Sequence, residues 1–226
     1  MDGTLIEAWA SLKSFVPKGD VVRSDDGDPG NPTVNFKGQK RSNATHQSTT
    51  DPESRLYKKG SGKEAKLCFG AHALMENRNG LCVHLNVGDP IQPTEPEAAQ
   101  ALLAEYTDLH EANPRTVGGD KGYHTKAFVE QCREKGIAPH VAQMKGRQTP
   151  GLDGRTTGQK GYQTSQKVRK RIEEVFGWMK TIGGFRKTRY RGIGRTQMCG
   201  QAVAATYNLV RVAKLALGPP GSVALA

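Results

Sequence analysis

The segment QKVRKRIEEVFGWMK, residues 166–180, carries the pattern on which both the fold and the function depend. At about 100° per residue, a helix places Arg169, Glu173 and Lys180 within roughly 40° of one another on one face. That face shows a carboxylate between two cations, although an ordinary salt-bridged helix has the same spacing, worth only about 0.3–0.5 kcal/mol per pair. The adjoining stripe is apolar and would pack on a sheet; its members are Ile172, Val175, Phe176 and Met179.

The positive charge of the chain is concentrated around and after this segment. The 226 residues carry 33 Lys and Arg against 22 Asp and Glu, a net charge of +11. Residues 1–150 hold 19 of each kind, whereas residues 151–226 hold 14 basic and 3 acidic residues. This asymmetry favours a polyanionic partner, and nucleic acid is the natural one because neutralised phosphates release counterions. A soluble basic face without a fixed ligand is the alternative.

Composition argues against several classes of protein. No stretch approaches 18 uninterrupted apolar residues, so we expect no transmembrane helix and no membrane partner. Met1 is followed by an Asp, without the basic and then apolar segments of a secretory signal. Four cysteines lie apart with no CxxC spacing, which argues against a zinc site and indicates reduced thiols of a cytoplasmic protein; they are Cys68, Cys82, Cys132 and Cys199.

The apolar patterns predict strands and helices in alternation. We expect one α/β domain over residues 1–217 with a mixed sheet covered by helices, loop-like insertions at about 16–59 and 143–164, and a flexible tail at 218–226. The expected elements are a strand at 4–9, a hairpin at 66–75 and 81–89 around an Asn-Gly turn, helices at 95–110, 124–135, 166–180 and 199–217, and short strands near 116–119 and 137–141.

Two further carboxylates lie beside expected strands. Asp120, within GGDKGY, follows a short strand, where α/β sheets commonly place functional groups. Its alternative role is a turn Asp that caps the next helix. Asp2 lies next to the first strand-like segment and by itself carries no functional signal.

Three segments in this order resemble the DDE transposases of bacterial insertion sequences: DGTLIEAWAS at 2–11, GGDKGY at 118–123 and RKRIEEVFGWMK at 169–180. The spacing of Arg169, Glu173 and Lys180 matches the Arg-Glu-Lys signature around that family's catalytic glutamate. Gln166 stands where the family pattern has a Tyr, which affects only the auxiliary role of that Tyr. The resemblance runs from Asp2 to about residue 217.

The resemblance implies a ribonuclease-H-like fold, a mixed five-stranded sheet flanked by helices. Asp2 would lie on the first strand, Asp120 at the end of the fourth, and Glu173 on a helix beside them. These three side chains would be the metal ligands, with Asp2 bridging two Mg2+ ions or, alternatively, Mn2+ ions. The implied reaction is hydrolysis at the ends of the element, followed by joining of the freed 3′-hydroxyls to target DNA.

The resemblance also implies double-stranded DNA as the partner, as element ends and as target. Arg169 and Lys180 would act in catalysis by contacting phosphates near the scissile bond. A basic set around them would track the backbone, unless it is a basic loop without a fixed ligand; its members are Arg171, Arg186, Lys187, Arg189, Tyr190, Arg191 and Arg195.

In the resembling family a sizeable N-terminal region precedes the first catalytic Asp, whereas here that Asp is residue 2. We therefore expect a truncated or split transposase that binds DNA and transposes weakly or not at all on its own. Two other hypotheses remain open, a DNA-binding remnant without catalytic activity and a ribonuclease-H-like nuclease without transposition. A homodimer is also open.

Overall fold

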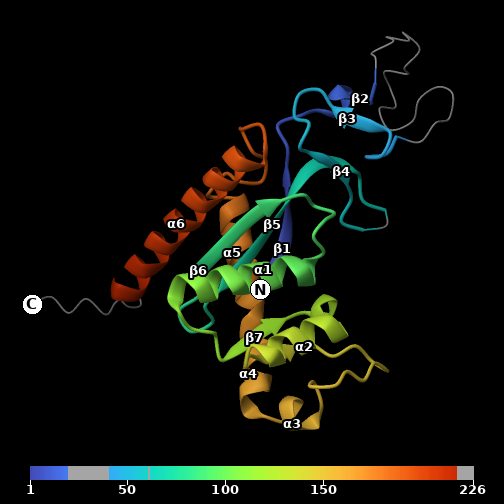
Figure 1. Cartoon of the computed structure of the whole chain (residues 1–226). Coiled ribbons are helices and arrows are strands. Elements are labelled where there is room, and N and C mark those ends of the chain that lie inside the picture. The colour runs from blue at the N-terminus through green and yellow to red at the C-terminus, as the bar shows by residue number, and fades with distance from the viewer. Residues whose placement is uncertain (20–40, 61, 218–226) are drawn as a thin grey trace, which may run out of the picture.

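The computed structural model describes residues 1–19, 41–60 and 62–217. Its largest sheet has four strands and is centred on β5 (Lys66–Met75), which pairs antiparallel with β1 (Asp2–Glu7), β6 (Cys82–Gly88) and β4 (Arg55–Tyr57). The β5–β6 hairpin is confirmed, and Gly80 of its Asn-Gly turn has a φ of 78°, which glycine adopts without strain. The mixed α/β class is therefore confirmed (Figure 1).

A second, parallel pair of strands lies beside this sheet. It consists of β7 (Thr116–Gly119) and β8 (Ala138–Val141), joined by the short 3-10 turn η2 (Lys121–Tyr123) and by α2 (Lys126–Glu134). A third pair, β2 (Phe15–Pro17) and β3 (His46–Ser48), follows the turn η1 (Leu12–Ser14) at the opposite end of the molecule (Figure 1).

The expected single five-stranded sheet is not formed in the described part of the chain, because β1 and β7 are not paired. Only the backbone nitrogen of Met1 donates a hydrogen bond to the Gly118 carbonyl, at 3.0 Å. At the far end of β1 the same edge is covered, since Glu7 N donates to Arg186 O and Thr188 N donates to Glu7 O.

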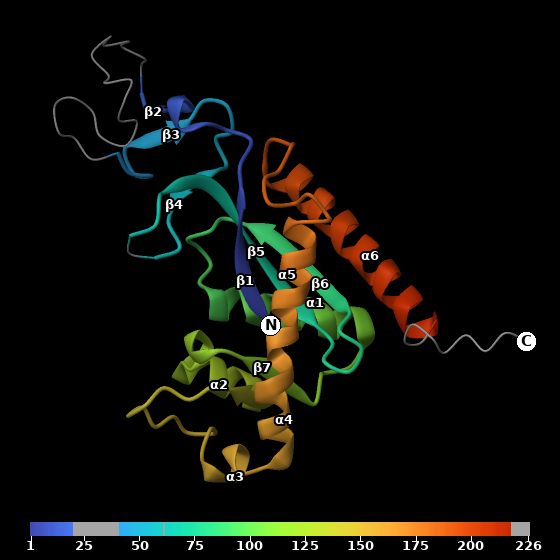
Figure 2. The same cartoon turned by 180° about the vertical axis from the view of Figure 1, so that it is seen from behind.

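Helices cover both faces of the four-stranded sheet (Figures 1 and 2). On one face lie α5 (Ile172–Lys180) and α6 (Ile193–Leu217), and every second residue of β5 packs toward them. This core is fully apolar at its centre and includes Ile6, Phe69, Ala71, Ala73, Leu85, Val87, Val175, Phe176, Met179 and Phe185.

On the other face lies α1 (Glu95–His110), whose bounds agree with the predicted helix. Thr94 and Glu97 form a capping box at its start, a pattern that satisfies two otherwise free backbone amides. The core under α1 extends from β6 and β5 into β7 and α2, and its members include Leu74, Leu102, Leu103, Val117, Phe128 and Val129. This second core joins the β7–β8 half to the main sheet.

The prediction of one continuous helix over residues 166–180 is wrong, although the segment is helical throughout. It is divided into α4 (Lys160–Val168), the 3-10 turn η3 (Arg169–Arg171) and α5. A 3-10 turn advances 120° per residue instead of 100°, so the turn changes the phase of Arg169 relative to Glu173.

Several bounds also differ from the predicted ones. The segment 143–164 contains α3 (Gly154–Thr157) and the start of α4, and α6 begins six residues earlier than expected. Within 16–59 the structure has part of β2 and the whole of β3 and β4, while residues 20–40 and the predicted tail at 218–226 lie outside the described residues.

The cysteines and the helices bear on two expectations drawn from composition, reduced thiols and the lack of a transmembrane helix. The four cysteines carry free thiols, three of them buried, as predicted for reduced side chains. Among the described residues, the helices are too short or too polar to cross a membrane.

Candidate active site

Asp2 is the first residue of β1 and lies at the strand end that faces β7 (Figure 2). Its Oδ1 accepts a hydrogen bond from the Gly3 amide at 2.8 Å. Burial raises the pKa of the Asp2 carboxyl above its ordinary value, and the negative charge of Asp120 raises it further, against the opposing effects of the Gly3 amide and Lys59. Asp2 therefore sits where a nearby positive charge would stabilise its ionised form.

Asp120 directly follows β7 and is exposed. Its Oδ1 accepts from the Gly122 amide at 2.7 Å, so it caps η2, as the alternative for this residue predicted. The capping role does not remove it from the site, because its charge acts on Asp2. The structure thus brings together two carboxylates that are 118 positions apart in sequence.

Glu173 lies near Asp2, whereas Asp120 does not line the hollow that Glu173 and Asp2 share. Glu173 is exposed in the first turn of α5, and this hollow measures about 230 Å³. Three cations also line it, Lys59, Lys180 and Arg186, beside neutral residues. An anionic ligand could therefore enter beside the two carboxylates.

Lys180 is fixed across this hollow. Its Nζ donates a hydrogen bond to Thr4 Oγ1 at 2.6 Å, which ties α5 to β1. Burial lowers the pKa of Lys180, and the positive charges of Lys59 and Arg186 lower it further. A phosphate bound here would relieve the repulsion among these three cations.

No three His, Cys, Asp or Glu side chains within residues 1–19, 41–60 and 62–217 stand close enough together to hold a metal ion. The carboxylate oxygens of Asp2, Asp120 and Glu173 are nevertheless hard ligands of the kind that divalent cations such as Mg2+ prefer. Asp2 and Asp120 each use only Oδ1 in a hydrogen bond with a described residue, which leaves the second oxygen for a ligand.

Glu95, the first residue of α1, is a carboxylate at this site that the sequence did not single out. A methyl group placed on Gly3 would lie 3.1 Å from its Oε1, and one placed on Gly122 would lie 3.7 Å from its Oε2. Desolvation raises the pKa of Glu95, as do the charges of Asp2 and Asp120. No sequence signal could have found it, because a Glu in the first turn of a helix is ordinarily favoured by the helix dipole.

Lys59 was also missed. It is exposed just beyond β4, and its positive charge opposes the raised pKa values of both Asp2 and Glu95. Nothing in the polar segment around it distinguishes Lys59 from the neighbouring Lys58. The pairing of β4 with β5 is what places Lys59 at the hollow.

The two arginines of η3 point to different places. Arg169 lies beside β7, where its Cβ is 3.5 Å from a methyl group built on Gly118, and its Nε donates to Gln166 Oε1 at 3.1 Å. Arg171 instead donates to the Asn77 carbonyl at 3.2 Å, in the β5–β6 turn. Arg169 is thus close to the carboxylate region, whereas Arg171 supports the hairpin.

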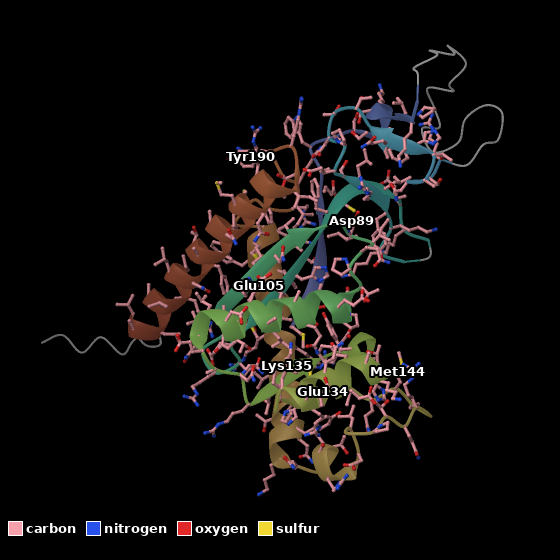
Figure 3. The ribbon with its side chains drawn as sticks, viewed as in Figure 1. Asp89, Glu105, Glu134, Lys135, Met144 and Tyr190 are labelled. Carbon is pink, nitrogen blue, oxygen red and sulfur yellow. The ribbon has the colours of Figure 1, made fainter. Side chains whose placement is uncertain are left out.

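The basic segment, residues 186–195, follows α5 and extends into the first turn of α6; its Lys and Arg side chains are exposed, and it borders the hollow through Arg186. Lys187 lies over the ring of Trp9, with Nζ 5.7 Å from the ring centroid, and its backbone forms a bridge with Glu7 of β1. Tyr190 is 49% exposed and projects from the loop that leads into α6 (Figure 3). The other exposed members are Arg189, Arg191 and Arg195.

One comparison with known proteins gave a match. A family model described as "Transposase DDE domain" matches residues 38–209, which include Asp120, Arg169, Glu173 and Lys180. Asp2 precedes the matched range. No curated protein and no solved structure matches the chain.

Proposed function

The chain belongs to the family of transposase DDE domains, and we propose that it cuts DNA at the ends of an insertion sequence and joins them to target DNA. The observation that supports the proposal is the position of Asp2, whose pKa is raised by the charge of Asp120 and which lines one hollow with Glu173 of α5.

These three carboxylates would hold divalent cations, Mg2+ or alternatively Mn2+. Bound cations would supply a lowered pKa for the attacking water or 3′-hydroxyl and would stabilise the leaving oxygen. The residues of the chain position the DNA: Lys180, held by Thr4, and Arg186 line the hollow and would bind the phosphates that flank the scissile bond. Arg169 would orient the strand from the β7 side.

The two sheets are, in this proposal, the halves of a ribonuclease-H-like sheet in the order β6-β5-β1-β7-β8. Support comes from the antiparallel β6-β5-β1 group, the parallel β7–β8 pair and the Met1–Gly118 hydrogen bond between them. Helices on both faces agree with that arrangement (Figures 1 and 2).

A nicking assay on supercoiled DNA tests the proposal. We expect nicked product with Mg2+ or Mn2+ and none with EDTA, because unscreened carboxylates repel a phosphodiester. A second reaction supplies matching terminal repeats and scores strand joining. DNA binding without nicking under any cation would instead identify a DNA-binding remnant, and nicking without joining would identify a nuclease.

The basic segment gives a separate prediction. The double substitution Arg189→Ala and Arg191→Ala should reduce the slope of log K against log salt by about 2 and weaken DNA binding on the order of 10-fold. The measurement is a fluorescence-anisotropy titration at several salt concentrations. Lys214→Ala, at the far end of α6, is the control and should change little; equal losses in both proteins would contradict a localised DNA surface.

A further inference from the structure

We propose that Asp51 and Glu53 are positioning residues for the basic segment: by accepting hydrogen bonds from amides at the start of α6, they hold its arginines in the arrangement that contacts DNA. The inference rests on the proposed function, since the segment matters to the reaction only if the chain binds DNA. It gives a role to the connection between β3 and β4, residues 49–54, which the sequence predicted only as part of a loop-like insertion.

Two carboxylates of this connection bind the start of α6. Asp51 Oδ2 accepts a hydrogen bond from the Gly192 amide at 3.1 Å, and Glu53 Oε2 accepts one from the Ile193 amide at 2.7 Å. Amides at a helix start have no partner within the helix, and the helix dipole favours negative charge there. Asp51 and Glu53 therefore cap α6 from positions 141 and 140 residues earlier in the chain.

The Asp51 carboxylate is held in place by the residues around it. Asp51 is 1% exposed, and its amide donates to Ser48 Oγ at 3.0 Å. Ser54 Oγ donates to the Asp51 carbonyl at 2.7 Å, and Ser48 Oγ lies 2.8 Å from Ser14 Oγ. Because these hydrogen bonds fix the backbone of Asp51, its side chain is a rigid support for α6 and not an adaptable surface charge.

Gly192 makes the contact with Glu53 possible. Its φ is 85°, in the left-handed region that favours glycine, and a methyl group built there would lie 2.7 Å from Glu53 Oε2. A side chain at this position would strain the backbone and displace the carboxylate.

The basic segment is fixed at both ends. Near its start, the Thr188 amide donates to the Glu7 carbonyl of β1 at 2.8 Å. Thr188 Oγ1 accepts from the Tyr190 amide at 3.1 Å and lies 3.2 Å from Thr196 Oγ1, and both threonines are buried. With the start of α6 held at the other end, the segment has a defined path. Its charged side chains are exposed along that path: Arg186, Lys187, Arg189, Arg191 and Arg195.

Charge and position make opposite predictions for DNA binding. A carboxylate beside a basic surface repels phosphates, so its removal alone should strengthen binding and steepen the dependence on salt. If Glu53 positions the segment, its removal should weaken binding, since a loosened segment loses conformational entropy when it meets DNA. The slope of log K against log salt should then fall by about 1, because fewer phosphates are contacted.

The test is a fluorescence-anisotropy titration of a labelled DNA duplex at several salt concentrations, for the wild type, Glu53→Ala, Glu53→Gln and Glu64→Ala. We expect Glu53→Ala to bind about 5-fold more weakly, the factor to which loss of one helix cap typically corresponds, and with the lower slope. Glu53→Gln keeps an acceptor oxygen and should bind within about 2-fold of the wild type. Glu64→Ala removes an exposed carboxylate from the segment between β4 and β5 and should bind no more weakly than the wild type. Glu53 is itself exposed, so neither substitution at this position should unfold the chain.

The outcomes separate the inference from the function. Weaker binding and a lower slope in Glu53→Ala, restored in Glu53→Gln, would support it. Binding by Glu53→Ala as tight as that of Glu64→Ala would overturn it, as would equal losses in Glu53→Ala and Glu53→Gln, and the proposed function would stand in both cases. No DNA binding by the wild type would overturn both. The expected binding pattern without nicking would keep the inference and remove the catalytic part of the proposed function.

Discussion

Replacing Asp2 by Asn is expected to lower Mg2+-dependent nicking by about 10³-fold or more while DNA affinity stays within a few-fold. The charge of Asp120 acts on Asp2, and Asp2 also lines the hollow with Glu173. Removal of its charge would cost several kcal/mol of transition-state stabilisation, and about 4 kcal/mol corresponds to 10³ in rate. Single-turnover nicking of supercoiled DNA provides the measurement.

The Asn side chain keeps the shape of Asp and can still accept from the Gly3 amide, so the loss should not come from unfolding. The pKa of Asp2 is raised in the folded chain, so its charge lowers stability as pH rises above the ordinary value of 3.8. At neutral pH without metal, Asp2→Asn should therefore melt no lower than the wild type. Retained nicking by this variant would remove Asp2 from the catalytic site.

Replacing Phe69 by Ala is expected to destabilise the fold by about 3–5 kcal/mol. Phe69 is 0% exposed on the central strand β5 and belongs to the core beneath α5 and α6. The cavity would lower the melting temperature by about 10 °C, since 1 kcal/mol corresponds to roughly 2–4 °C in a chain of this size. Thermal melting followed by circular dichroism measures the shift.

The matched control is Phe69→Leu, which keeps most of the apolar volume and should cost less than about 1.5 kcal/mol. A loss from the core would also weaken the site, because β5 holds β1 in register from Asp2↔Ala73 to Glu7↔Cys68. Equal melting temperatures for the alanine variant and the wild type would show that the sheet does not depend on this contact.

Local signals made part of the fold predictable. The helix at 95–110 follows from a capping box and an apolar period, both of which lie within a few residues of one another. The hairpin follows from one Asn-Gly pair. The missing pairing between β1 and β7 was not predictable, because it depends on how two segments 117 positions apart, joined by the Met1–Gly118 hydrogen bond, are aligned in the fold.

At the candidate site, too, some residues could be predicted from the sequence and others could not. Glu173 and Lys180 were identified from their spacing together with the family resemblance, and the structure places both on one hollow. Arg171 belonged to the same run of basic residues, but η3 directs it to the hairpin turn. Glu95 and Lys59 had no local signal, since their position beside Asp2 depends on contacts that only the folded chain creates.

The short strand β1 also sets a length. Asp2 begins it, and Glu7 at its other end is hydrogen-bonded to the backbone of the basic segment at Arg186 and Thr188. At roughly 3.3 Å per residue, these ends are about 17–20 Å apart. A DNA strand rises about 3.4 Å per nucleotide, so under the proposed function this length would correspond to about five or six base pairs between the phosphates bound near Thr188 and the bond cut near Asp2.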